Sequence, residues 1–162
     1  MNVHVYGKRE YSRLVADLAV LCGHEVVGFV DDSDAGDDDF VLGVGYNNLQ
    51  ARASLVSRLR LVTLVHPRAY VRNPELIEAG SVVMAGAVID MGVRIGRGAV
   101  IWNGANLIHD VEIGENTFVS PGATICGRTR IGRDCFIGAG AVVVDHLDVP
   151  DGTFIKAGSL YK

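Results

Sequence analysis

The sequence has no stretch rich in lysine and arginine, and its formal net charge is −4 with a pI near 5.7. A protein that binds nucleic acid or an anionic membrane through its charge needs a cluster of basic residues. The composition therefore argues against both classes of partner. We expect small molecules or further copies of the same chain as partners.

Cysteine is scarce, and the three that occur, Cys22, Cys126 and Cys135, lie far apart in apolar surroundings. An odd number of widely spaced cysteines indicates neither a disulfide framework nor a metal site. We expect buried, reduced thiols and hence a cytoplasmic protein. The sequence also shows neither an export signal at its N-terminus nor the ~18 successive apolar residues of a membrane span. This predicts a soluble, unexported chain.

What the sequence does contain is an aliphatic residue at every sixth position between Val65 and Ile155, within a repetitive stretch that runs to Leu160. A period of six matches neither the ~3.6-residue repeat of a helix nor the two-residue alternation of a strand. It is typical of a parallel β-helix, in which short strands form the sides of a triangular prism. The aliphatic side chains fill the interior, and mostly small residues four positions later fit the corners. We expect glycines such as Gly96 and Gly114 to relieve the backbone at the bends.

The residues before this repeat alternate between strand and helix patterns, which predicts a small Rossmann-like α/β unit. We place the boundary near residue 62, with domains at 1–62 and 63–162. The expected elements are strands at Val3–Gly7, Glu25–Val30, Phe40–Val44 and Leu61–Val65, and helices at Tyr11–Cys22 and Asn48–Leu59.

The first strand of this unit is followed by a single glycine, Gly7, and by the basic pair Lys8 and Arg9. A nicotinamide dinucleotide site would require a Gly-x-Gly-x-x-Gly motif here, so a dehydrogenase is not expected. Lys8 and Arg9 either meet a phosphate at the start of the helix or are exposed basic side chains. Asp31 and Asp32 follow the second strand, at the sheet edge where ligands of open α/β sheets bind.

The repeat also predicts which side chains are neighbours, because three six-residue sides make one coil. Residues eighteen apart then lie on successive coils, about 4.8 Å apart. His109 should lie beside Gly127, on the outside of the prism. His109 could act as a base near neutral pH, with Asp110 orienting it or raising its basicity, and the Gly127 amide could bind an oxyanion. The alternative is an ordinary surface histidine.

Metal binding is not expected, because the remaining histidines, His4, His24, His66 and His146, are scattered along the chain. The γ-class carbonic anhydrases bind metal on a similar prism, between subunits. Their pair of histidines five residues apart is absent from this sequence.

Several motifs together resemble a family of sugar acetyltransferases that includes bacillosamine N-acetyltransferase and sialic acid O-acetyltransferase. The similarity extends over nearly the whole chain. The motifs are Gly28-Phe29-Val30-Asp31-Asp32, Gly45, Asn47-Asn48, Leu64-Val65-His66-Pro67, Ile108-His109-Asp110 with Ile113-Gly114, Pro121-Gly122-Ala123 and Ile137-Gly138-Ala139-Gly140-Ala141.

The resemblance implies a homotrimer of left-handed β-helices, with acetyl-CoA as co-substrate in the grooves between subunits and no metal. It implies that His109 is the general base, Asp110 the residue that enhances its basicity, and Gly127 the backbone donor to the thioester carbonyl. It places the coenzyme against Phe118, Gly127, Ala139 and Ala157, and the nucleotide of a nucleotide sugar against Asp31, Asp32 and Gly45.

These observations favour an acetyltransferase that acts on the amino group of a nucleotide-linked amino sugar in surface glycan biosynthesis. Two alternatives stay open. One is an O-acetyltransferase of the sialic acid type, which would acetylate a sugar hydroxyl. The other is a non-catalytic trimer that binds sugars or serves as a scaffold.

Overall fold

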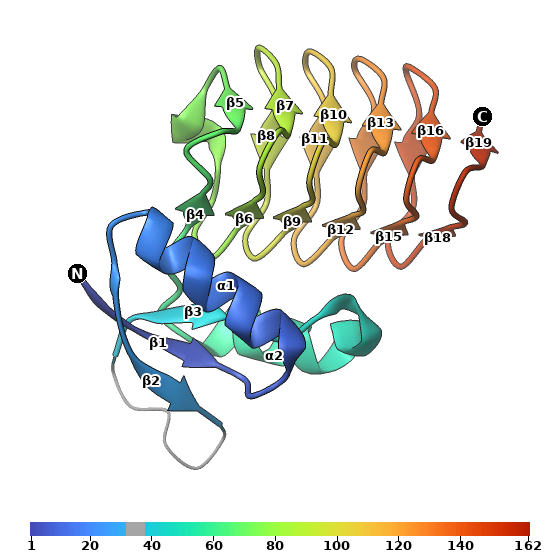
Figure 1. Ribbon diagram of the computed structural model, residues 1–162. Helices are drawn as coiled ribbons and strands as arrows, with labels where there is room; N and C mark the ends of the chain where they lie inside the picture. The colour runs from blue at the N-terminus through green and yellow to red at the C-terminus, as the bar shows by residue number, and fades with distance from the viewer. Residues whose placement is uncertain (32–37) are drawn as a thin grey trace.

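The computed structural model describes residues 1–31 and 38–162, which form a small α/β domain beside a long β-helix (Figure 1). The small domain has a three-stranded parallel sheet in the order β2-β1-β3. Its elements are β1 (Asn2–Tyr6), α1 (Glu10–Leu21), β2 (Glu25–Val30), β3 (Phe40–Leu42), the 3-10 helix η1 (Tyr46–Asn48) and α2 (Leu49–Arg58).

The two helices cover opposite faces of this sheet, as in a Rossmann-like unit. Val3 and Val5 of β1 pack with the buried face of α1, whereas Tyr6 packs with Leu55 and Val56 of α2. Alternate strand residues point to opposite faces, so β1 needs apolar side chains on both. The predicted α/β unit is confirmed.

The predicted fourth strand, Leu61–Val65, is wrong as a member of this sheet. Leu61 forms only an isolated bridge with Phe40, and the chain then turns away. Leu64 and Val65 form β4, which pairs with β6 (Val82–Val83) of the β-helix. This apolar run therefore pairs with the small sheet at Leu61 and with the β-helix at Leu64 and Val65.

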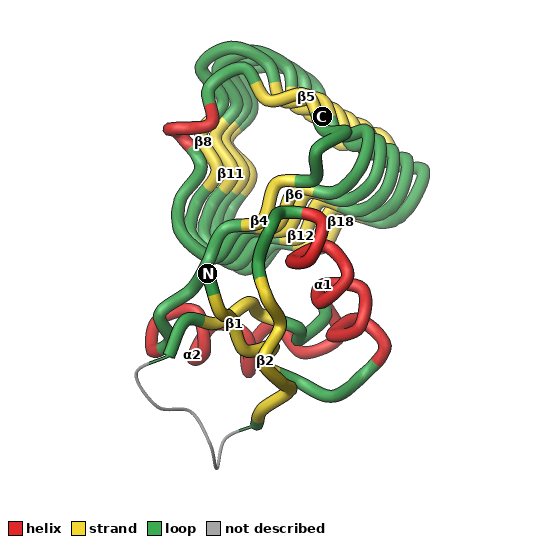
Figure 2. The backbone as a smooth tube through the Cα atoms, turned by 60° about the vertical axis from the view of Figure 1, so that its left-hand side comes forward, coloured by secondary structure: helices red, strands yellow, loops and turns green. Residues whose placement is uncertain are grey.

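The β-helix has three faces of short parallel strands stacked coil upon coil (Figure 2). We call them the first, second and third face in the order in which the chain visits them. The first face contains β4, β6, β9 (Val100–Ile101), β12 (Phe118–Val119), β15 (Phe136–Ile137) and β18 (Phe154–Ile155). The second contains β5 (Tyr70–Val71), β7 (Val88–Ile89), β10 (Asn106–Leu107), β13 (Thr124–Ile125), β16 (Val142–Val143) and β19 (Leu160–Tyr161). The third contains β8 (Arg94–Ile95), β11 (Glu112–Ile113), β14 (Arg130–Ile131) and β17 (Asp148–Val149).

The six-residue repeat places its aliphatic residues inside the prism, as predicted. From Val83 to Ile155 each of them is at most 3% exposed, and one continuous core contains them all. The spacing of eighteen is confirmed as well, because Leu107 pairs with Ile125 and Ile125 with Val143. The predicted parallel β-helix is therefore confirmed.

The repeat is interrupted in its first coil. Where a third-face strand is expected, the chain forms the 3-10 helix η2 (Pro74–Leu76), and Ile77 makes only an isolated bridge with Ile95. Pro74 is at the start of this helix, where its fixed φ favours a helical turn. The third face consequently begins one coil later than the other two.

The expected role of the glycines that follow the aliphatic residues is wrong. Gly114 does not have the positive φ of a bend residue, but a Cβ atom on it would collide with the backbone of Gly132 on the next coil. The positive φ angles fall two residues further along, at glycines such as Gly92 and at non-glycine residues such as Asp110. Close stacking of coils, not bending, explains glycine at the Gly114 position.

The small domain is joined to the β-helix by a shared core and a buried arginine. Apolar side chains of α1 pack against Val82, Val100 and Phe118 of the first face. Arg52 of α2 is 0% exposed and lies with its guanidinium carbon 5.5 Å from the centre of the Phe118 ring. Its Nη1 donates to the Val44 carbonyl, and its remaining two hydrogen bonds reach the β-helix.

Those two bonds tie α2 to neighbouring coils. Arg52 Nη2 donates to the Gly98 carbonyl at 2.6 Å, and Nε donates to Asn116 Oδ1 at 3.1 Å. Asn116 in turn donates to Asp134 Oδ1 at 2.7 Å. No carboxylate in the described residues pairs directly with the guanidinium, and burial lowers the pKa of Arg52.

Tyr11 of α1 lies in the same interface, and its hydroxyl group is buried without a hydrogen-bond partner among the described residues. An unsatisfied buried hydroxyl costs about 1–3 kcal/mol. We therefore expect Tyr11→Phe to raise the free energy of unfolding by about 1 kcal/mol in urea denaturation at neutral pH. Tyr70→Phe, at an exposed position, is the control. A Tyr11→Phe protein less stable than wild type would show that the Tyr11 hydroxyl makes a stabilising hydrogen bond.

The ionisation of Tyr11 adds a pH dependence. Burial raises its pKa from 10 to about 12. The folded protein holds this proton more tightly than the unfolded chain does. The stabilisation of the folded state that follows from this difference is fully present below pH 10 and is lost as the pH rises towards 12. The Tyr11→Phe protein should lose less stability across this window.

Candidate active site

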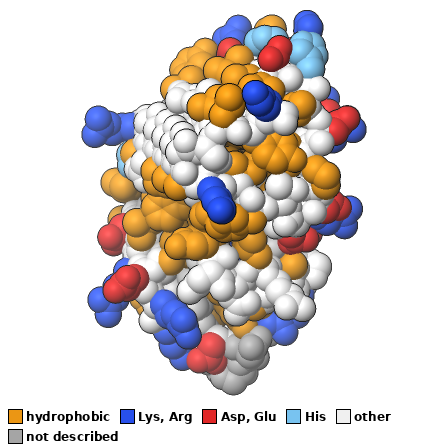
Figure 3. All heavy atoms as spheres, turned by 90° about the vertical axis from the view of Figure 1, so that its right-hand side faces the viewer, with side chains coloured by type: hydrophobic (Ala, Val, Ile, Leu, Met, Phe, Trp, Pro, Cys, Tyr) orange, Lys and Arg blue, Asp and Glu red, His pale blue; other side chains and the backbone are white. Residues whose placement is uncertain are grey.

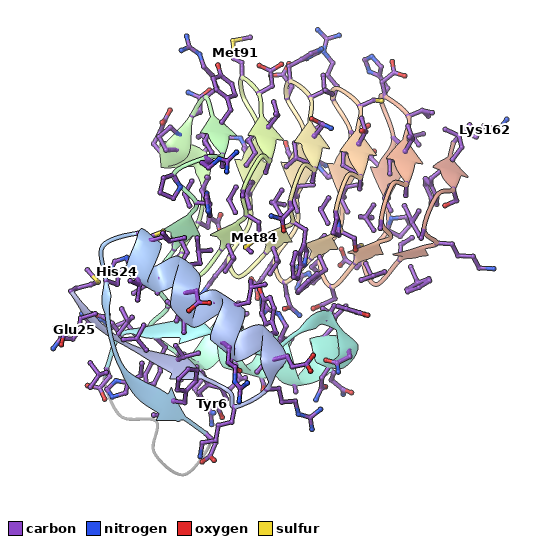
Figure 4. The ribbon with its side chains drawn as sticks, viewed as in Figure 1. Tyr6, His24, Glu25, Met84, Met91 and Lys162 are labelled. Atoms are coloured by element: carbon purple, nitrogen blue, oxygen red, sulfur yellow. The ribbon has the colours of Figure 1, made fainter. Side chains whose placement is uncertain are left out.

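His109 lies at the corner between the second and third faces, two residues after the end of β10. Met91, labelled in Figure 4 on the outer edge of the prism, belongs to the preceding coil of this corner, and its carbonyl accepts from the Asp110 amide. On the following coil, a Cβ atom added to Gly127 would lie 2.8 Å from Cε1 and Nε2 of His109. The structure thus has His109 and Gly127 side by side, as the spacing predicts.

Asp110 is placed to orient the His109 ring. Nδ1 of His109 lies 3.1 Å from Oδ2 of Asp110, and the two side chains are 45% and 51% exposed. The turn gives Asp110 a φ of 58°, which an aspartate tolerates better than most residues. A proton on Nδ1, donated to the carboxylate, leaves the lone pair of Nε2 free to accept a proton on the side of Gly127.

The Gly127 amide is available as a hydrogen-bond donor. The neighbouring amides of Cys126 and Arg128 donate to Val143 and His109 carbonyls, but no acceptor for the Gly127 amide occurs in the described part of the chain. A base and a free N–H donor beside one another are what general-base catalysis of acyl transfer requires.

This closeness yields a prediction for Gly127→Ala. The added methyl group would force the His109 ring to move, and a displacement of about 1 Å at a reacting group can cost about 100-fold in rate. We expect a loss of that order in kcat/KM, measured as CoA release. Gly28→Ala is the control, because its methyl group would reach only His4, at 4.0 Å. Full activity of Gly127→Ala would show that the ring position is not critical.

The predicted coenzyme residues Ala139 and Ala157 lie at a different corner, between the first and second faces. Both line a groove of about 410 Å³. Figure 3 looks at this end of the molecule and shows hydrophobic side chains gathered on it. The other lining residues are Tyr46, Trp102, Ser120, Pro121, Phe136, Gly138, Phe154 and Lys156.

Phe118 has a different surrounding from the one predicted. Its ring is 0% exposed and packs beneath Tyr11, Tyr46 and Trp102, with centroid separations of 5.7 to 6.3 Å. In this conformation Phe118 supports the groove from behind and offers a coenzyme no surface. Its predicted contact with the coenzyme would require the covering rings to move.

The residues predicted to bind a nucleotide sugar meet at the carboxyl edge of the small sheet. Lys8 Nζ and Asp31 Oδ2 form an ion pair of 2.6 Å across the ends of β1 and β2. Gly45 follows β3 at the same edge, next to Tyr11. Arg9 precedes α1, and its amide donates to Ser12 Oγ. Asp32 lies outside the described residues.

The sequence patterns did not indicate four residues that form much of the groove wall: Tyr46, Trp102, Phe154 and Lys156. The spacing did contain a signal, because Phe118, Phe136 and Phe154 lie eighteen residues apart and pair on successive coils. Tyr46 had no such signal, since its place depends on how the small domain docks. Within the described ranges, no group of three or more metal-ligating side chains comes together.

A second hollow, of about 520 Å³, runs along the third face. Its charged side chains largely neutralise one another, as in the ion pairs of Glu112 with Arg130 and of Arg133 with Asp151. Neither His109 nor Gly127 lines it. This hollow is therefore separate from the candidate catalytic pair of His109 and Gly127.

Comparison with known proteins agrees with this geometry. Residues 92–127 and 110–145 match a family model described as bacterial transferase hexapeptide (six repeats). The acetyltransferase domain of PglB from Neisseria gonorrhoeae superimposes with a TM-score of 0.81 at 26% identity, covering 99% of this chain and 91% of that domain. This chain therefore contains the transferase hexapeptide repeat and has the fold of the PglB acetyltransferase domain.

Two further structures resemble this chain over most of its length. The PglB domain in complex with acetyl coenzyme A matches with a TM-score of 0.75 at 27% identity, covering 98% of this chain and 94% of that one. A mutant of GDP-perosamine N-acetyl transferase from Caulobacter crescentus, in complex with CoA and GDP-perosamine, matches with a TM-score of 0.72 at 25% identity. This match covers 96% of this chain and 93% of the N-acetyl transferase chain.

A search of curated protein sequences gives no significant match to this chain. Among its described residues, neither helix has the length and apolar character needed to cross a membrane.

Proposed function

We propose that this protein is an acetyltransferase that transfers the acetyl group of acetyl-CoA to the amino group of a nucleotide-linked amino sugar, in surface glycan biosynthesis. The observation that carries this proposal is the pairing of His109 with the free amide of Gly127. The similar GDP-perosamine N-acetyl transferase, seen with CoA and GDP-perosamine, supports the substrate class.

In the proposed mechanism the sugar amine attacks the thioester carbonyl carbon. His109 Nε2 accepts the proton that the amine loses, while Asp110 holds Nδ1. The Gly127 amide donates to the oxyanion of the tetrahedral intermediate. Collapse of the intermediate breaks the C–S bond, and the departing thiolate takes the proton from His109. The products are the N-acetylated sugar and CoA.

We further propose a homotrimer with its active sites between subunits. His109 and the Ala139–Ala157 groove lie at opposite edges of the second face, so a coenzyme in the groove is separated from the His109 of its own chain by the width of that face. Exposed apolar side chains run along the same face: Tyr70, Val88, Val142 and Leu160. Burying this row against neighbouring copies would bring His109 of one subunit to the groove of the next.

The acceptor would bind with its nucleotide at the edge formed by Lys8, Arg9, Asp31, Asp32 and Gly45, in the small domain that we assign to residues 1–62. Tyr46, which follows Gly45, also lines the groove. The acceptor site and the coenzyme groove therefore share a wall. The free cysteines support a reducing, cytoplasmic location.

The test is a screen of nucleotide-linked amino sugars for CoA release from acetyl-CoA, each compared with its hydroxyl counterpart. N-acetylation predicts turnover of the amino sugar and little turnover of the hydroxyl sugar, because a free amine is the better nucleophile. Preference for the hydroxyl compound would indicate an O-acetyltransferase. Calorimetry that shows no binding of acetyl-CoA would favour a non-catalytic trimer.

A further inference from the structure

The third face of the β-helix carries charges whose sign alternates from coil to coil. Each of its strands β8, β11, β14 and β17 has a buried aliphatic second residue, so its first residue points outward. The outward residues pair in register on successive coils. In coil order they are Arg94, Glu112, Arg130 and Asp148. A second row, three residues further along each coil, repeats the same order of signs: Arg97, Glu115, Arg133 and Asp151.

This face is open to solvent in the single chain. The small domain packs against the first face, and Figure 2 shows β8 and β11 on another side of the prism. The side chains of Glu112 and Arg130 are 46% and 64% exposed, and Arg94 and Asp148 are exposed as well. Members of both rows line the hollow of about 520 Å³ on this face. The surface that the third face offers to a partner is therefore charged, not apolar.

The charges of the first row are only partly paired within the chain. Arg130 Nε donates to Glu112 Oε2 at 2.9 Å, which satisfies the centre of the row. Arg94 and Asp148, at its two ends, make no side-chain hydrogen bond or ion pair with any described residue. Asp148 influences Arg130 through its charge alone. The row therefore has an unpaired cation at one end and an unpaired anion at the other.

We propose that the third face binds the third face of a second copy of this chain, antiparallel, about a twofold axis that passes between the coils of Glu112 and Arg130. Arg94 of each copy then faces Asp148 of the other, and Glu112 faces Arg130. Both end pairs form at once, because Arg94 and Asp148 are three coil spacings of about 4.8 Å apart in each copy. The second row has the same order of signs and matches in the same way. A parallel copy would place like charges opposite one another, so the charges select the antiparallel arrangement.

This contact differs from the trimer contact proposed through the second face, which buries apolar side chains. It is also independent of the proposed reaction, because neither His109 nor Gly127 lines the third-face hollow. Ion pairs between exposed side chains are weak and are screened by salt. The association should therefore be reversible and restricted to low ionic strength.

Sedimentation velocity of the full-length protein tests this contact at low salt and at about 1 M salt, where the Debye length falls to about 3 Å. Wild type should form a larger, concentration-dependent species at low salt and lose it at high salt. Arg94→Glu should weaken this association at least about tenfold, because both end contacts then join like charges. Asp148→Arg should have the same effect. Arg13→Glu and Asp17→Arg, at exposed positions of α1, are controls with the same changes of charge.

Mixing the Arg94→Glu and Asp148→Arg proteins gives the sharpest result. A one-to-one mixture should regain the wild-type association, because the new glutamate of one protein meets the new arginine of the other. Two variants that had lost their fold could not recover in this way. Wild type of equal size at both salt concentrations, full association of either variant alone, or a mixture that does not associate would each overturn the proposal. The proposed acetyl transfer would stand in all three cases, since CoA release measures it separately.

Discussion

Replacing His109 by alanine is expected to lower kcat/KM for acetyl transfer by about 100- to 10,000-fold, the usual contribution of a general base. The ring is half-exposed at a corner and contributes nothing to the core, so the fold and the affinity for acetyl-CoA should be preserved. The measurement is CoA release over a range of acceptor concentrations, together with calorimetric binding of acetyl-CoA. A drop in rate without a drop in affinity is the signature of a lost base.

The matched control for this variant is His146→Ala. His146 is 60% exposed, lies at the same corner on the coil after Gly127 and has its own carboxylate, Asp145, 3.6 Å away, but it holds the repeat position of Asp110 and not that of His109. Its removal should leave the rate within twofold or so of wild type. Equal rates for His109→Ala and wild type would rule out His109 as the base.

Replacing Arg52 by alanine is expected to lower the free energy of unfolding by about 3 kcal/mol or more. The substitution leaves the Val44 and Gly98 carbonyls and the Asn116 side chain without their donor, and it opens a cavity beside Phe118. Removing a desolvated charge offsets part of this loss. Urea denaturation followed by circular dichroism measures the change.

Two further variants separate the causes. Arg52→Met fills the cavity but supplies no donors, so it should recover only part of the lost stability. Arg72→Ala, at an exposed arginine of the first coil, should change the stability by less than about 0.5 kcal/mol. If Arg52→Ala were no more harmful than Arg72→Ala, the buried hydrogen bonds would have no net stabilising effect.

The sequence predicted the stacked coils well because a period of six constrains every position at once. Once Leu107 is placed beneath Ile125, the positions of His109 and Gly127 follow from arithmetic, and the structure has them side by side. The interruption at Pro74 was missed because a single proline does not alter the aliphatic period. The role of Gly114 was predicted wrongly because the residues next to it in the sequence do not indicate its close contact with Gly132 on the next coil.

Sequence patterns did not predict the features that depend on how the small domain packs against the β-helix. Nothing around Arg52 indicates that a β-helix will bury it, since its hydrogen-bond partner Asn116 is 64 residues away. The exposure of Phe118 depends on where α1 and η1 come to lie, and the position of Tyr46 in the groove wall does too. Local periodicity predicts the fold of each unit separately, whereas the burial and position of these side chains depend on the contact between the small domain and the β-helix.

The core that α1 shares with Val82, Val100 and Phe118 has a consequence for how the protein loses its structure. A fragment of residues 1–62 alone would expose the outer side of α1 and the Arg52 guanidinium to water, and would not be expected to remain folded. The two units should melt in a single cooperative transition. A nucleotide that binds only at the Lys8–Asp31 edge would then raise the melting temperature of the distant β-helix coils as well.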